Sequence, residues 1–163
     1  MRFLTRWLGT FSLLRGMTER TALVAPRSLH PEQTFHRLIH SESERSERSG
    51  HSCRVLLIYR IDAQEAPVPM DADVVTNTIS LLSSSLRATD AIGWYRDGYI
   101  LGGLLAALHP DTAVGDYGNL TTRLMDGLRQ ARSFTDGHTV QMRVINPGER
   151  TVLEALQNVK REA

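Results

Sequence analysis

The amino-acid sequence predicts an α/β domain of the α+β kind, with a ferredoxin-like βαββαβ order. One antiparallel sheet carries the helices on one face. Two observations indicate this fold. Short apolar runs of strand length alternate with segments of helical periodicity, and Asp97-Gly98 between two such runs is a strong hairpin signal. A chain of 163 residues that is 41% hydrophobic and 23% charged can form one domain with a buried core plus a tail.

The first elements of this order are a helix, a strand and a second helix. A helix is expected from Pro31 to about Ser46, because Pro suits a first turn and Glu32 suits a helix N-terminus. The nearly continuous apolar run at 54–61 predicts a central strand covered on both faces. Asp71 is a plausible N-cap for the next helix, whose apolar side consists of Val75, Ile79, Leu82 and Leu86.

A hairpin follows, with strands at 91–95 and from Tyr99 to about Leu105 joined by a two-residue primed turn at Asp97-Gly98. Asp111 or Thr112 can cap a long helix. A last strand is expected at 139–145, and an amphipathic helix at 149–160 closes the chain. The inner face of the long helix includes Leu120, Leu124 and Leu128, and that of the closing helix Val152, Leu153 and Leu156.

Residues 1–30 form a separate basic segment ahead of the domain at 31–163. The apolar stretch within residues 1–28 is too short and too charged to span a membrane. It is not followed by the small-residue cleavage site that is typical of a secretory signal. Three interpretations stay open: a peripheral membrane helix, a helix docked on its own domain or a dimer partner, and a frayed tail. The apolar residues at helical spacing are Phe3, Leu4, Trp7, Leu8, Phe11 and Leu14.

Charge and cysteine content restrict the remaining possibilities. A net charge of +1 gives no reason to expect nucleic-acid binding, and the single Cys53 excludes an internal disulfide and fits a reducing compartment. We therefore expect a cytoplasmic protein, with membrane association through residues 1–28 as the alternative. His36 and His40 lie four apart on one helix, but a zinc site needs three or four ligands, so no metal and no cofactor are expected.

The segment Arg87-Ala-Thr-Asp90 lies five residues ahead of Arg96-Asp97-Gly98-Tyr99-Ile100, the predicted hairpin tip. This layout resembles the GGDEF family, the diguanylate cyclases that make cyclic di-GMP from GTP. In that family Arg-x-x-Asp precedes by five residues a hairpin with the tip Gly-Gly-Asp/Glu-Glu-Phe. The resemblance runs from about Phe35 to the end of the chain and implies a palm-type, nucleotide-cyclase-like sheet.

The catalytic residues of the family differ in this chain. The first strand of the family ends in Asp-x-Asp-x-Phe-Lys, whose first Asp helps to hold the metals, and Arg60 occupies that position here while Asp62 matches the second Asp. The acidic metal ligand of the hairpin tip aligns with Gly98. Since two divalent ions held by carboxylates normally stabilise the transition state of this reaction, the resemblance implies a degenerate, catalytically inactive pseudo-enzyme. An active nucleotide-processing enzyme is the third interpretation.

Arg87 and Asp90 are the candidate ligand-binding residues. The resemblance implies an inhibitory site, or I-site, where the Arg bonds guanine or phosphate of cyclic di-GMP and the Asp accepts from guanine N–H groups. The structural alternative is that Arg87 interacts with a helix dipole and Asp90 caps the turn. Arg60 and Arg96 are candidate phosphate contacts that replace the metals, or else solvent-facing residues in surface ion pairs.

The sequence therefore predicts an inactive GGDEF-like regulatory domain that is a cyclic di-GMP receptor through Arg87 and Asp90. The alternative is a ligand-free protein-interaction or dimerisation module, with a protein partner or a second copy of the chain. The resemblance implies a place in bacterial signalling or exopolysaccharide control for either one.

Overall fold

The structure is a computed structural model that describes residues 28–109, 117–130 and 137–147. Residues 1–27 of the predicted N-terminal segment, the caps Asp111 and Thr112 and the helix at 149–160 lie outside these residues. Within them the order β1–α2–β3–β4–α3–β5 confirms the βαββαβ prediction, with α1 ahead of it and a short extra strand, β2. The elements are α1 (Glu32–Ser49), β1 (Ser52–Ile61), β2 (Pro67–Val68), α2 (Ala72–Ser85), β3 (Ala91–Arg96), β4 (Ile100–Leu108), α3 (Gly118–Gln130) and β5 (Thr139–Ile145).

The strands form one antiparallel sheet with β1 in the middle. On one edge of β1 runs β4, followed by β3, and β5 runs along the other edge. Arg60 pairs with both Val140 of β5 and Val68 of β2, so β2 must lie on the edge that β4 uses, beyond the point where the β4 pairing ends at Tyr59. None of the helices in the described residues is long and apolar enough to cross a membrane.

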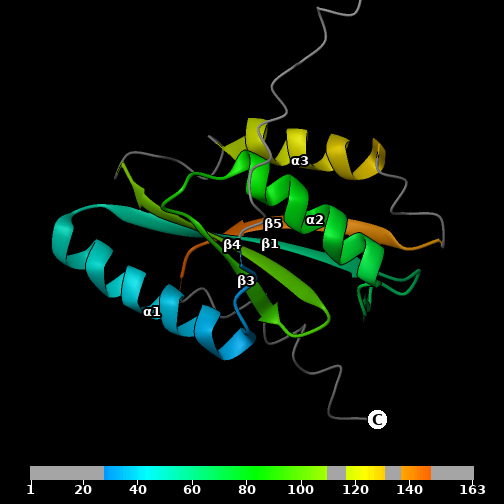
Figure 1. The fold of residues 1–163 in the computed structure, drawn as a ribbon, viewed down its shortest axis with the longest axis horizontal. Helices are drawn as coiled ribbons and strands as arrows, with labels where there is room; N and C mark the ends of the chain where they lie inside the picture. The colour runs from blue at the N-terminus through cyan, green and yellow to red at the C-terminus, as the bar shows by residue number, and fades with distance from the viewer. Residues whose placement is uncertain (1–27, 110–116, 131–136, 148–163) are drawn as a thin grey trace, which may run out of the picture.

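Helices cover both faces of the sheet (Figure 1). Successive side chains of a strand point to opposite faces, and in β1 Leu57 packs under α1 while Leu56 packs under α2 and α3. This confirms that the strand is covered on both sides. The expectation of helices on one face holds only for α2 and α3, because the leading helix α1 occupies the opposite face.

α1 lies close against the hairpin because two glycines face its most buried side chain. Phe35 is fully buried. A Cβ atom built at Gly102 would lie 2.3 Å from Cε1 of Phe35, and one built at Gly93 would lie 2.5 Å from the Phe35 ring. The helix also bonds the hairpin near its tip, where Glu32 accepts from the Asp97 backbone N–H at 2.7 Å. Ahead of α1, His30 forms a parallel bridge to Gly93 on the outer edge of β3.

The hairpin turn differs from the predicted two-residue primed turn. Arg96 pairs with Ile100, so three residues form the loop, and the Tyr99 N–H donates to the Arg96 carbonyl at 3.0 Å. A primed type I′ turn needs positive φ at both central residues, but in this loop only Gly98, at 73°, has it. A register shift between Trp94 and Arg96 accounts for the longer loop.

Candidate ligand-binding site

Asp90 sits in the turn between α2 and β3 and is buried, with 8% of its surface exposed. Its carboxylate accepts from the backbone N–H of Arg87 at 2.8 Å and from that of Ala106 at 3.1 Å. The Asp90 N–H in turn donates to the Arg87 carbonyl at 3.0 Å. The carboxylate therefore closes its own turn and ties it to β4, which is the cap expected in the structural alternative.

The Arg87 side chain, by contrast, is exposed at the end of α2. Within the described residues its guanidinium has no hydrogen-bond or ion-pair partner. The two residues of the motif thus differ in role: Asp90 is built into the fold, whereas Arg87 keeps its five donors for solvent or a ligand.

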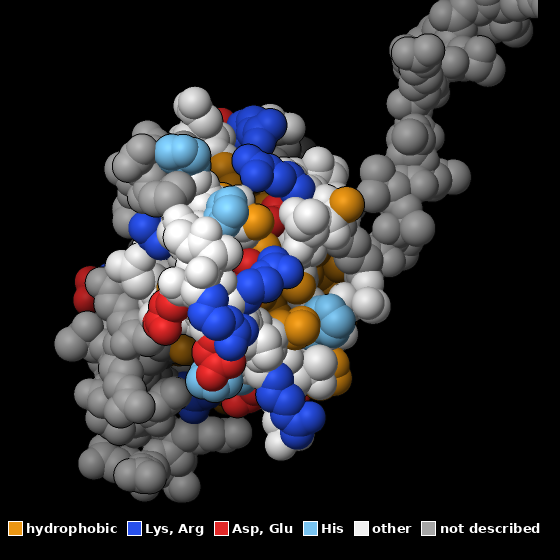
Figure 2. All heavy atoms as spheres, turned by 90° about the vertical axis from the view of Figure 1, so that its left-hand side faces the viewer, with side chains coloured by type: hydrophobic (Ala, Val, Ile, Leu, Met, Phe, Trp, Pro, Cys, Tyr) orange, Lys and Arg blue, Asp and Glu red, His pale blue; other side chains and the backbone are white. Residues whose placement is uncertain are grey.

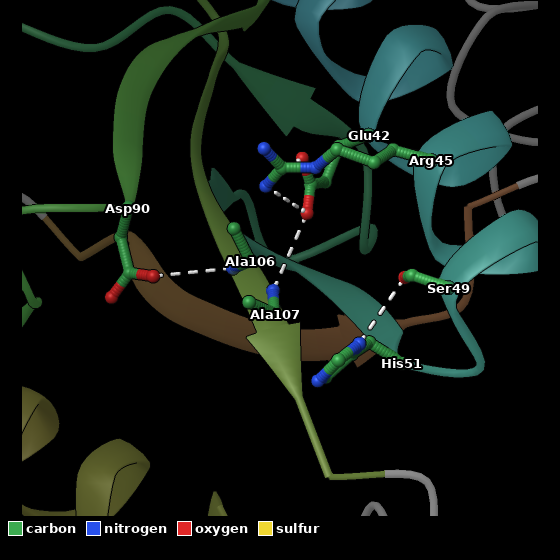
Figure 3. Close-up of polar contacts among 7 residues, drawn as sticks. All are labelled: Glu42, Arg45, Ser49, His51, Asp90, Ala106 and Ala107. Carbon is green, nitrogen blue, oxygen red and sulfur yellow. Dashed lines mark hydrogen bonds and ion pairs between the residues drawn. The ribbon is translucent and has the colours of Figure 1, made fainter.

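β4 contains a bulge where it passes this turn. Ser52 pairs with Leu108 and Arg54 with Leu105, so Cys53 alone faces both Ala106 and Ala107. Ala107 has a positive φ of 49°, which is costly for a residue with a Cβ. Its N–H donates to Glu42 of α1 at 3.3 Å, so two carboxylates hold consecutive N–H groups of the bulge (Figure 3).

Glu42 was missed by sequence reasoning, which singled out no acidic residue of the leading helix except Glu32 at its start. Its side chain is only 12% exposed and also pairs with Arg45 at 2.7 Å. No spacing rule distinguishes it from its acidic neighbours on α1, since its role depends on the non-local approach of β4.

A cavity of about 570 Å³ opens beside Arg87, between the end of α2, the end of β4 and α3. Its volume is in the range of small-molecule sites, about 300–1,000 Å³. The polar lining is mainly cationic or ionisable to a cation: Arg87, Arg123 of α3, His51 and His109, with Asp90. Such a lining suits a phosphate-bearing anion, because Arg forks match phosphate oxygens.

Arg60 is almost completely buried, with 1% of its surface exposed. Nη1 donates to Oδ2 of Asp71 at 2.6 Å and Nη2 lies 2.7 Å from Nδ1 of His138. Since guanidinium has no acceptor, His138 Nδ1 accepts this bond. The solvent-facing interpretation of Arg60 is therefore wrong, because its side chain is buried and bonded to Asp71 and His138. A phosphate contact at Arg60 stays a prediction and would require the ligand to replace Asp71.

Asp71 itself makes no side-chain cap bond to α2. The predicted N-cap position is right, but the Arg60 guanidinium takes the carboxylate that would have capped the helix. Arg96, the fourth candidate, is half-buried and lies over the Tyr99 ring at 5.0 Å, a cation–π contact at the hairpin tip.

The two positions that align with the family's metal ligands lie at the same end of the sheet. Tyr59 pairs with Ile100, which places Arg60, near the end of β1, close to the hairpin loop that contains Gly98, and the Met70 N–H donates to the Gly98 carbonyl at 2.8 Å. A cation and a residue without a side chain do not fit a divalent metal, which needs oxygen ligands. Asp62, the remaining acid, accepts from the N–H groups of Gln64 and Ala66, both at 2.9 Å.

The part of the chain that is described contains no group of three or more His, Cys, Asp or Glu side chains able to hold a metal ion. His36 bonds the Tyr95 carbonyl at 2.7 Å, and His40 lies 3.2 Å from Glu44. Burial, with a smaller contribution from Glu32, raises the pKa of Tyr95. Figure 2 shows Arg and His side chains interspersed with acidic ones on the face that carries α1, so this face has no single sign of charge.

No protein-family model and no curated protein matches the sequence. Solved structures do match. The diguanylate cyclase SiaD of Pseudomonas aeruginosa, in complex with its activator SiaC, superposes with a TM-score of 0.53 and 20% identity over 86% of this chain. The chain has the fold of a GGDEF domain. The GGDEF domain of YfiN (TpbB) from the same organism gives a TM-score of 0.50 and 18% identity over 85% of this chain and 88% of its own. The chain spans 60% of the SiaD chain.

Proposed function

We propose that this GGDEF-fold domain is a non-catalytic regulatory module that binds cyclic di-GMP in the cavity beside Arg87. The observation that carries the proposal is the position of the exposed Arg87 guanidinium, which has no partner among the described residues, at a cavity of about 570 Å³ whose lining includes a second arginine, Arg123. Two arginine forks at one cavity can bind the two phosphates of a cyclic dinucleotide.

The loss of catalysis is supported by the residues at the end of β1 and at the hairpin tip. Joining two GTP molecules develops charge on the phosphates that metal ions normally stabilise, and the loss of both ions raises the barrier by several kcal/mol or more. Arg60 is held there by Asp71 and His138, and a buried cation repels a divalent metal. Gly98 supplies no ligand.

Titration calorimetry with cyclic di-GMP tests the binding site. We expect a dissociation constant of tens of micromolar or tighter for the intact chain and a loss of about tenfold or more for Arg87→Ala, the typical cost of a charge-assisted contact. Arg37→Ala, which removes an exposed arginine of α1 that does not line the cavity, is the control. If the intact chain does not bind cyclic di-GMP at tens of micromolar, the proposed receptor function is wrong.

A cyclase assay tests the proposed inactivity. Incubation of the protein with GTP and Mg²⁺ or Mn²⁺ should yield no cyclic di-GMP under conditions in which SiaD with SiaC serves as the positive control. Product formation by the intact chain contradicts the assignment of Arg60 and Gly98 to the metal positions.

The second candidate is an interaction module that acts through a protein partner or a second copy of the chain. One observation favours it: SiaD, which has the same fold, was solved in complex with its activator SiaC. Sedimentation of the intact chain with and without cyclic di-GMP separates the candidates, because a ligand-free module associates equally in both conditions.

A further inference from the structure

Two histidines line the cavity beside the arginines, at the place where β1 begins and β4 ends. His51 precedes β1 and His109 follows β4, and the residues next to them, Ser52 and Leu108, pair across the sheet. The Ser52 hydroxyl also donates to the His109 carbonyl at 3.3 Å. This pairing brings His51 and His109 together at one wall of the cavity.

We propose that His51 and His109 are phosphate-contacting residues in their protonated form, so that the cavity binds a phosphate-bearing anion more tightly in mild acid than in mild alkali. The inference rests on the proposed function, since it concerns the same site. It adds two ligand contacts and a dependence on pH that the Arg87 and Asp90 motif does not provide.

The ring geometry of His51 allows this contact. Its Nδ1 lies 3.2 Å from the Ser49 hydroxyl (Figure 3). When the ring is protonated both nitrogens donate, so Nδ1 can donate to Ser49 while Nε2 donates to a phosphate oxygen. In the neutral ring Nδ1 can accept from the Ser49 hydroxyl while the Nε2–H group donates to the phosphate, so protonation adds a positive charge to this contact rather than the contact itself.

The charges around the cavity favour the binding of an anion, and the protonation of the two histidines sets how positive the cavity is. Arg87, Arg123 and Asp90 give the described lining a net charge of +1, which rises to +3 when His51 and His109 are protonated. Histidine is the side chain that gains its positive charge between mild alkali and mild acid, whereas carboxylates and guanidinium groups keep their charge over that range. Affinity should therefore rise as the pH falls from about 8 to about 6.

The neighbouring charges of α1 do not cancel this effect. Glu42, which bonds the bulge, is paired with Arg45. The last turns of the helix before His51 carry Glu47 and Arg48, which are of opposite sign. The part of α1 next to His51 therefore adds no net charge from these four side chains.

Calorimetry with cyclic di-GMP at about pH 6 and about pH 8 tests the inference. A partly exposed ion pair changes affinity by about threefold, so two of them should make binding to the intact chain about tenfold tighter at the lower pH. The double variant His51→Gln/His109→Gln should reduce this ratio to less than about twofold, and Arg87→Ala should weaken binding at both pH values. His40→Gln, which alters an exposed histidine of α1, should leave the ratio unchanged.

An unchanged ratio in the double variant, or no pH dependence of the intact chain, overturns the inference while the receptor function stands. If cyclic di-GMP binds at neither pH, the receptor function fails, and NMR with inorganic pyrophosphate then decides on the histidines. Pyrophosphate should move the titration of the His51 and His109 ring signals to higher pH and leave that of His40 in place. No movement of the two cavity histidines rejects the inference on its own.

Discussion

Replacement of Asp90 by Ala should destabilise the protein strongly in the absence of any ligand. The carboxylate accepts from two backbone N–H groups, those of Arg87 and Ala106, at 2.8 and 3.1 Å. Hydrogen bonds to a charged acceptor contribute about 1.5–3 kcal/mol each. Because the bond from the Arg87 N–H is only partly buried, water can replace the carboxylate there, and we expect a total loss of about 2–4 kcal/mol in the free energy of unfolding.

Urea denaturation followed by circular dichroism measures this loss. For a domain of this size it corresponds to a fall in Tm of about 10 °C. The matched control is Arg87→Ala, which removes an exposed side chain and leaves its backbone N–H in place. That variant should unfold within about 0.5 kcal/mol of the intact protein.

Equal stability of Asp90→Ala and the intact protein would refute the reasoning, because it would mean that the carboxylate does not hold the turn to β4. Asp90→Asn gives a second check. The amide keeps one acceptor oxygen but turns its NH₂ group toward the other backbone N–H. The stability loss of Asp90→Asn should therefore fall between the losses of Arg87→Ala and Asp90→Ala.

Two further predictions concern the core. Gly102→Ala should cost about 2–3 kcal/mol in stability, because its Cβ meets the Phe35 ring at 2.3 Å, whereas Gly103→Ala meets only a Leu86 methyl at 3.1 Å and should cost less than about 1 kcal/mol; equal losses in urea denaturation would contradict this. Burial raises the pKa of the Cys53 thiol above 9.0, so the unfolded chain loses this proton first and stability should fall as the pH rises above 9.0. Cys53→Val should flatten that fall, and an unchanged slope would exclude the thiol as its cause.

Periodic apolar patterns were sufficient to predict most of the fold. The strand at 54–61 was recognised because both of its faces are apolar, and it forms β1 with two more residues at its start. The face of α3 followed from helical spacing, since Leu124 and Leu128 are buried as expected. The face of α2 was predicted only in part, because Leu82 is buried but Val75 and Ile79 are partly buried while Val74 and Thr78 are fully buried. β2 was missed because two residues, Pro67 and Val68, carry no periodicity.

The site was less accessible to sequence reasoning, because its contacts are non-local. Asp71 has the sequence position of an N-cap but is bonded by Arg60, eleven residues earlier. The bulge at Ala107 has no glycine to mark its positive φ. The cavity unites residues from four parts of the chain, and of these residues only Arg87 and Asp90 belong to a sequence motif.

The bridge between His30 and β3 has a consequence for self-association. The His30 N–H donates to the Ile92 carbonyl and its own carbonyl accepts from the Trp94 N–H, both at 2.9 Å. Unpaired groups along an outer strand are a template for adding a foreign strand, and the lead-in to α1 occupies the middle of that template. A strand of a second copy could therefore pair with β3 only after this segment had been displaced from it.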